Sequence, residues 1–225
     1  MSRESGAPFV ILGGMSLSPV EPAIDSYRQP SGRVEAEIKV KGSRFLAEVI
    51  PAPDIETVQG GLASVRKRFF DATHHCSAWR VGEDGREFRF DDDGEPSGSA
   101  GLPILRQIDA LGLTNLLVVV TRWFGGTKLG TGGLARAYGD TAHAALALAP
   151  IEERFLLTTF RLDFSFGDTS PAMHTLSRFD ARVLDTRYGI GTSMDVAVRR
   201  SQAGPFEAAW VEALAGRGSV ERLGP

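Results

Sequence analysis

The chain has 225 residues, of which 42 % are hydrophobic and 24 % charged, and its formal net charge is −3. This composition suits one large or two small soluble domains, and it excludes a strongly basic nucleic-acid binder, so nucleic-acid binding would need a local patch. No apolar run approaches the roughly 20 residues that span a membrane, and the single cysteine, Cys76, excludes an internal disulfide, so we expect a cytoplasmic protein.

The first 32 residues predict a loosely ordered leader. Residues 8–12 form a short apolar run, but no good small-residue cleavage site follows, so we do not interpret the run as a signal peptide. Residues 16–32 are rich in proline, serine and glycine and show no periodicity, which is typical of a segment without regular structure.

Residues 33–150 predict an alternation of strands and helices. Apolar residues spaced three and four apart after Asp54 predict an amphipathic helix that Asp54 caps. A second helix is expected from a Ser99 cap to Gly112, and a third from about 134 to 148. The expected strands are two within 34–50 around a turn at 41–43, a hairpin of 75–81 and 87–90, and a central strand at 116–120.

Residues 151–225 predict a second domain, with the boundary near Pro150. The expected order is strand, helix, strand, strand, helix, strand, which is the ferredoxin-like βαββαβ pattern. The segments are 155–166, 169–179, 182–188, 194–199, 206–214 and 219–222.

The glycine segment at 121–138, TRWFGGTKLGTGGLARAY, predicts a strand, a loop and the start of a helix. Glycine allows close approach of a backbone to a ligand, and a helix start offers free N–H groups to an anion. Arg122 and Lys128 add positive charge beside it, and Trp123 and Phe124 would offer stacking surfaces if they are exposed. The segment therefore predicts an anion-binding surface.

Three other interpretations of the glycine segment are a P-loop, a dinucleotide-binding loop and a structural turn. A phosphate-binding P-loop fails because Leu129, and not serine or threonine, follows Lys128. The pattern Gly130-x-Gly132-x-x-Ala135 imitates a dinucleotide fingerprint, but a long loop separates it from the preceding strand. The third is a purely structural turn that lets the helix pack close to the sheet, and burial of both aromatic rings would favour it.

The segment DATHHC at 71–76 brings two histidines next to the cysteine. In a strand, His74 and Cys76 would share one face and His75 the other, so the three cannot form one metal site without a bulge. A nucleophilic Cys–His pair is conceivable, but no third orienting group is in view. The alternative is a half-buried histidine pair beside an inert, buried cysteine.

Two further segments carry charge. The loop DDDGEPSG at 91–98 clusters carboxylates, which suits either a solvated loop, a cation site or the orientation of nearby basic residues. It does not fit the calcium-loop template. The segment KGSRF at 41–45 places two cations around a turn, which suits a phosphate or an RNA backbone.

Four motifs in this order resemble the YigZ/IMPACT family. They are Lys41-x-Ser43-x-Phe45, Ala72-x-His74-His75-Cys76, Asp92-Asp93-Gly94-Glu95-Pro96-x-Gly98, and Arg122-x-Phe124-Gly125-Gly126-x-x-Leu129-Gly130-x-Gly132-Gly133-Leu134. They cover most of residues 35–149 and in combination are highly specific. One departure is Trp123, where the family usually has another aromatic residue such as tyrosine.

The resemblance implies an α+β fold of two domains and a link to translation regulation. It implies that 33–150 form an α/β sandwich like the second domain of ribosomal protein S-five, and that 151–225 form a ferredoxin-like domain similar to a terminal domain of elongation factor G. Eukaryotic relatives bind a ribosome-associated activator of a stress kinase through an additional N-terminal domain. This chain lacks that domain, so the partner is not carried over. The resemblance supplies no catalytic residues.

We therefore expect a non-enzymatic regulatory protein that binds RNA or the ribosome, without cofactor, metal or membrane, and with a translation-linked protein as a further partner. The alternatives are a metal-assisted hydrolase or transferase acting on a small phosphorylated or peptide-like substrate, with His75 as base and Asp93 or Glu95 on the metal, and a protein adaptor with an exposed apolar patch. The expected nucleic-acid or anion-binding residues are Lys41, Ser43, Arg44, His74, His75, Arg122, Trp123, Gly125, Gly126, Lys128, Gly130, Gly132 and Gly133, supported by Asp93, Gly94, Glu95 and Ser97.

Overall fold

The structure, a computed structural model, describes residues 25–224. The strands are β1 Ser26–Pro30, β2 Val34–Val40, β3 Ser43–Pro51, β4 His74–Val81, β5 Glu87–Asp91, β6 Leu116–Trp123, β7 Ile151–Phe155, β8 Leu157–Phe164, β9 Arg182–Tyr188, β10 Thr192–Arg199 and β11 Ser219–Gly224. The α-helices are α1 Ile55–Arg68, α2 Gly101–Ala110, α3 Gly130–Leu148, α4 Thr169–Arg178 and α5 Ala203–Ala213. None of these helices is long and apolar enough to cross a membrane.

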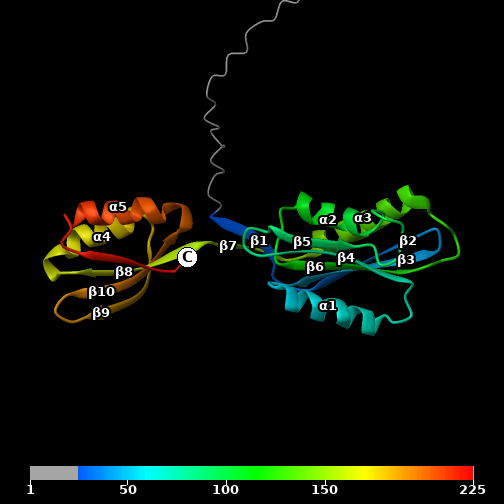
Figure 1. The fold of residues 1–225 in the computed structure, drawn as a ribbon, viewed down its shortest axis with the longest axis horizontal. Coiled ribbons are helices and arrows are strands. Elements are labelled where there is room, and N and C mark those ends of the chain that lie inside the picture. The colour runs from blue at the N-terminus through cyan, green and yellow to red at the C-terminus, as the bar shows by residue number, and fades with distance from the viewer. Residues whose placement is uncertain (1–24, 225) are drawn as a thin grey trace, which may run out of the picture.

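A five-stranded sheet in the order β2-β3-β6-β4-β5 forms the larger part of the fold. Helices α2 and α3 cover one face of this sheet and α1 covers the other (Figure 1). The central strand β6 is buried on both faces from Leu116 to Val120, as its continuous apolar sequence predicts. The capped helix after Asp54 is also confirmed, because the Asp54 carboxylate accepts a hydrogen bond of 2.7 Å from the Thr57 N–H.

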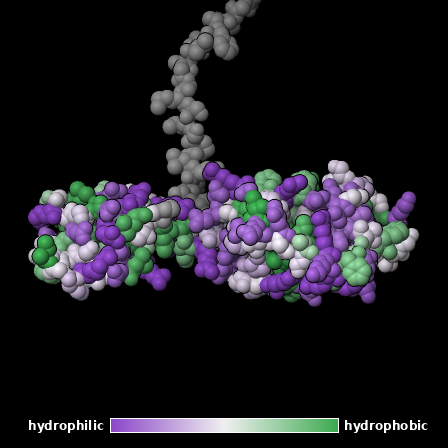
Figure 2. All heavy atoms as spheres, turned by 60° about the horizontal axis from the view of Figure 1, so that its bottom comes forward, coloured by the Kyte–Doolittle hydropathy of each residue, from purple (hydrophilic) through white to green (hydrophobic). Residues whose placement is uncertain are grey.

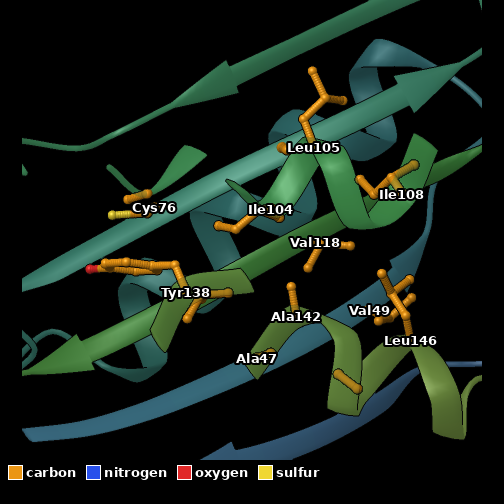
Figure 3. Close-up of a cluster of buried hydrophobic side chains, with 14 of the residues drawn as sticks. Ala47, Val49, Cys76, Ile104, Leu105, Ile108, Val118, Tyr138, Ala142 and Leu146 are labelled. Carbon is orange, nitrogen blue, oxygen red and sulfur yellow. The ribbon is translucent and has the colours of Figure 1, made fainter. Parts of the chain in front are cut away.

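The main hydrophobic core lies between this sheet and helices α2 and α3. Its largest fully buried side chains include Phe45, Ile104 and Tyr138, and the Phe45 and Tyr138 rings meet edge to face at 5.2 Å. In Figure 3, Cys76 and Tyr138 lie together at one end of this core, away from Ile108 and Leu146. A polar hydroxyl therefore sits at the edge of an otherwise apolar layer.

A four-stranded antiparallel sheet in the order β11-β8-β10-β9 forms the second part. Numbered along the chain these strands are in the order 4-1-3-2, and α4 and α5 pack on one face (Figure 1). Phe160, Phe206 and Trp210 fill the core between the sheet and the two helices. The α+β class and the ferredoxin-like arrangement predicted for this region are confirmed.

Strand β1 was missed by the sequence analysis. Residues 26–30 were assigned to a loosely ordered leader, but they pair antiparallel with β7 from Ser26↔Phe155 to Pro30↔Ile151. The rest of the predicted leader, residues 1–24, lies outside the described residues. The expected strand at 155–166 is also different, because it breaks at Leu156, whose N–H donates to the Asp25 carbonyl.

The start of α2 differs from the sequence expectation as well. Ser99 does not cap this helix, because its hydroxyl donates to the Pro96 carbonyl at 2.6 Å. The Asp92 carboxylate takes the capping role instead and accepts hydrogen bonds from the N–H groups of Gly98, Ala100 and Gly101 at 2.7 to 2.9 Å. One acidic side chain thus holds both the loop and the first turn of α2.

Candidate functional site

Three loops meet at the end of the five-stranded sheet that lies away from the four-stranded sheet (Figure 1). They are the β2–β3 turn at 41–42, the α1–β4 connection at 69–73, and the loop from 124 to 129 that leads into α3. Hydrogen bonds join them: the Phe124 N–H donates to Thr73 Oγ1 at 3.1 Å, and the Gly125 N–H donates to Ser43 Oγ at 3.2 Å. We call this end of the molecule the three-loop surface.

Gly42 and Gly125 are required by the packing of two of these loops. A Cβ atom on Gly125 would lie 1.9 Å from the carbonyl carbon of Gly42, so no side chain fits there. Gly42 also has a φ of +86°, which favours glycine. The structural interpretation therefore accounts for Gly125, one of the expected ligand-binding glycines.

The glycines at the start of α3 have a different environment. Gly126 and Gly130 adopt positive φ angles of 85° and 72°. A Cβ atom on Gly126, Gly130 or Gly132 would meet no heavy atom of the described part of the chain within 4 Å. Helix α3 begins at Gly130, four residues before the expected start, without a side-chain cap or an acidic residue in its first turn. The backbone N–H groups of the first turn of α3 are therefore open to a ligand that approaches from solvent.

Arg122 is buried and does not reach the surface. Only 4 % of the residue is exposed, and its guanidinium group donates to Glu95 Oε1 at 2.5 Å and to Ser43 Oγ at 3.3 Å. Its Nε atom has no hydrogen-bond partner among residues 25–224. We expected Arg122 and Ser43 to contact a phosphate directly, and this is corrected. Both side chains point into the protein, where their hydrogen bonds support the loops.

Glu95 is the carboxylate on which this buried network converges. Besides Arg122, the Tyr138 hydroxyl donates to Glu95 Oε1 at 2.8 Å, and His74 Nε2 lies 3.9 Å from the same oxygen. The Glu95 side chain is 5 % exposed. Burial raises the pKa of Tyr138, so its hydroxyl remains a neutral donor.

Asp93 has a similar role on the other side of the acidic loop. Its carboxylate accepts hydrogen bonds from the His75 N–H at 2.6 Å and from Arg66 at 2.9 Å. Its backbone carbonyl lies 2.8 Å from His74 Nδ1, so that nitrogen carries the proton in the neutral ring and Nε2 is left facing Glu95. The neighbouring Gly94 has a φ of +87° and packs near His74, while Ser97 is exposed.

His75 and Cys76 are held in buried positions. His75 Nε2 lies 3.1 Å from the Phe69 carbonyl, and burial lowers the pKa of His75, with the hydrogen bond to Phe69 opposing this shift. Cys76 is fully buried, its thiol donates to the Asp92 carbonyl, and burial raises the pKa of the thiol far above its usual value. This environment matches the inert buried cysteine and disfavours a nucleophilic thiolate.

The metal-assisted alternative needs a set of ligands. Within residues 25–224, no group of three or more His, Cys, Asp or Glu side chains is arranged to hold a metal ion. Asp93 and Glu95, which this alternative assigns to the metal, are instead engaged by Arg66 and Arg122. The contacts in this part of the chain therefore give the alternative no donor set.

Several side chains of the three-loop surface do face outward. Lys41 and Lys128 are exposed, and 47 % of Phe124 is exposed. Phe70, which the sequence analysis missed, is 84 % exposed in the α1–β4 connection. Its signal was available: the apolar stripe of α1 ends at Phe69, so a second phenylalanine has no place on the buried face.

Trp123 and Arg44 lie at the side of this surface and pack on each other. The Arg44 guanidinium group sits 4.3 Å from the Trp123 ring centre and pairs with Glu37 at 2.8 Å. The Trp123 Nε1–H donates to Asp71 at 3.1 Å, and its ring meets the edge of Phe69. The Trp123 ring is thus held by the protein itself, whereas Phe124 keeps an accessible face.

A cavity of about 790 Å³ lies elsewhere, in the four-stranded part beside the β9–β10 hairpin. Tyr188 and Ile190 at its rim are strongly exposed. Its two arginines, Arg187 and Arg217, are paired with Asp195 and Asp168. No pattern in the sequence predicts this cavity, and it is not part of the three-loop surface.

Comparison with known proteins places the three-loop surface within a described domain. The Impact N-terminal domain matches residues 41–146. The IMPACT family member YigZ of Escherichia coli strain K12 is 31 % identical over 202 residues, which cover 89 % of this chain and 98 % of that protein. Protein IMPACT of Rattus norvegicus is 35 % identical over 98 residues, or 42 % of this chain and 31 % of that protein. A crystal structure of a hypothetical protein, 30 % identical, superposes with a TM-score of 0.60 and covers 88 % of this chain and 97 % of that one.

Proposed function

Because the chain belongs to the IMPACT family, for which the sequence resemblance implies a link to translation, we propose that it is a cytoplasmic regulatory protein that binds RNA, free or within the ribosome. The three-loop surface is the binding site. Lys41 and Lys128 contact phosphates, and the open N–H groups at the start of α3 donate hydrogen bonds to a further anionic oxygen.

The observation that carries this proposal is a pair of exposed lysines on two loops that are in contact, one of which leads into the start of α3. Lys41 and Lys128 are exposed and form no ion pair with any residue of the described range 25–224. The contact between Gly42 and Gly125 holds their two loops together. The open positions at Gly130 and Gly132 allow a phosphate to approach the backbone.

The nearby carboxylates do not cancel this charge. Glu95 is buried and balanced by Arg122, and Asp93 pairs with Arg66. The three loops carry one exposed carboxylate, Asp71, which accepts a hydrogen bond from the Trp123 Nε1–H. The two lysines and the partial positive charge of the α3 start outweigh it, although the whole chain is acidic. This is the local patch that binding of RNA by a chain of net charge −3 requires.

The salt dependence of RNA binding tests the proposal. The variant with Lys41→Gln and Lys128→Gln removes two phosphate contacts, so the slope of log affinity against log salt should flatten by roughly 1.4 to 1.8. The matched control carries Arg89→Gln and Arg106→Gln, two exposed cations outside the three loops. Filter binding over a range of salt measures both, and equal slopes for the two variants would contradict the site.

Sedimentation with ribosomes separates RNA binding from the adaptor alternative. At low salt the protein should pellet with ribosomes and be released as salt rises, because phosphate contacts exchange with cations. An adaptor that uses an apolar patch would stay bound at high salt. On the face seen in Figure 2, hydrophobic residues are interspersed with hydrophilic ones and form no continuous patch.

A further inference from the structure

We infer that the RNA bound at the three-loop surface is single-stranded, and that Phe124 and Phe70 stack on its unpaired bases. This inference rests on the proposed function and narrows it to one class of RNA. The observation behind it is the presence of two exposed phenylalanine rings on two loops that are hydrogen-bonded to one another, one of which also carries the exposed Lys128.

Phe124 is exposed on a rigid backbone. Its own N–H donates to Thr73 Oγ1, and the next N–H donates to Ser43 Oγ. The Arg122 guanidinium group lies 5.5 Å from the Phe124 ring centre, on a residue that Glu95 fixes in the interior. Arg122 therefore supports the ring from the protein interior, while 47 % of Phe124 stays exposed. Because the ring is already held in place, a base can stack on it with little loss of conformational entropy in the protein.

Phe70 is exposed, whereas the neighbouring Phe69 packs against the protein. Phe69 meets the Trp123 ring edge to face at 5.4 Å and lies under Arg68. Burying a phenylalanine would stabilise the fold, but Phe70 contributes little buried apolar area because 84 % of it is exposed. The Thr73 N–H donates to the Arg122 carbonyl at 2.8 Å, which ties the connection that carries Phe70 to the strand that leads to Phe124.

The surroundings of these rings favour bases over a protein partner or a duplex. Phe124 is followed in the chain by two glycines, a threonine and Lys128, and Phe70 by the exposed Asp71 and an alanine. Small and charged residues, and not large aliphatic ones, therefore follow both rings. Duplex RNA is recognised through its backbone and shape, and its bases are stacked on one another. Aromatic side chains next to cations are the arrangement that holds unpaired bases.

Fluorescence anisotropy with three labelled RNAs tests the inference. The RNAs are a 20-nucleotide oligouridylate, a 20-nucleotide oligoadenylate and a 20-base-pair duplex, each titrated with the full chain. The single strands should bind more tightly than the duplex at equal salt. Phe124→Leu and Phe70→Leu should each weaken single-strand binding at least about fivefold and leave duplex binding unchanged, because each removes a stacking face and keeps an apolar side chain. Phe124→Trp should retain the affinity.

The matched control replaces two other exposed phenylalanines, with Phe88→Leu in β5 and Phe166→Leu before α4. It should bind all three RNAs like the parent chain, and circular dichroism should show that every variant remains folded.

Equal affinity for single strands and duplex, or full affinity in the Phe124→Leu and Phe70→Leu variants, overturns this inference. A lysine-dependent salt slope would still support the proposed function. Absence of binding to every RNA and to ribosomes overturns both. Loss of ribosome binding in the leucine variants with unchanged oligonucleotide binding indicates a protein contact and also overturns it.

Discussion

A single carboxylate, Glu95, joins the buried polar residues that lie beneath the three-loop surface. It pairs with Arg122, accepts a hydrogen bond from the Tyr138 hydroxyl and faces His74. Arg122 in turn lies 5.5 Å from the ring centre of the exposed Phe124. The sequence indicated that these motifs belong together, since acidic loop, histidine pair and arginine occur in one family pattern. It did not indicate that Arg122 points inward. An arginine beside a glycine loop gives the same sequence pattern whether its side chain faces a bound phosphate or a buried carboxylate.

Replacing Glu95 tests this buried pair. Glu95→Gln keeps the size of the side chain but leaves the Arg122 charge without a counter-ion, which should lower the free energy of unfolding by about 3–5 kcal/mol. Urea unfolding measures the loss. The double variant Glu95→Gln with Arg122→Met removes the isolated charge and should recover part of the stability. A loss below 1 kcal/mol in the single variant would show that the pair does not hold the loops.

At the scale of elements, regular periodicity was predictable and long-range pairing was not. The stripe of α1 and the apolar run of β6 each carry enough local signal to define an element. Strand β1 carries none, because its partner β7 lies more than a hundred residues away and both strands are polar. The cap of α2 was misassigned for a related reason, since Asp92 reaches its first turn from a loop several residues earlier.

The Asp92 contacts predict a defined effect on α2. Asp92→Ala removes a carboxylate that accepts three backbone hydrogen bonds, so it should cost about 2 kcal/mol, at the upper end for a helix cap. Asp92→Asn keeps acceptor capacity and should lose less. Hydrogen exchange should show faster exchange in 98–105 in the alanine variant. Ser99→Ala is the control, and a larger effect there than at Asp92 would contradict the assignment of the cap.

At the scale of the whole molecule, the two sheets carry separate cores. The arrangement 4-1-3-2 of the smaller sheet followed from the order of its elements, because the βαββαβ pattern limits the possible topologies. The contacts between the two parts include the β1–β7 ribbon and an exposed pair of Arg200 with Glu83 at 3.0 Å. An exposed ion pair contributes at most about 1 kcal/mol, so the coupling depends largely on the ribbon.

We therefore expect residues 33–150 and 151–225 to unfold as separable domains. Leu176→Ala in α4 creates a cavity in the smaller core and should cost about 2–5 kcal/mol there. Amides of β8 to β11 should then exchange faster while those of β2 to β6 keep their protection, because few buried contacts connect the two cores. Ile108→Ala in α2 is the reciprocal control and should affect only the larger sheet. If either variant accelerates exchange equally in both sheets, the ribbon transmits the full destabilisation and the chain behaves as one cooperative unit.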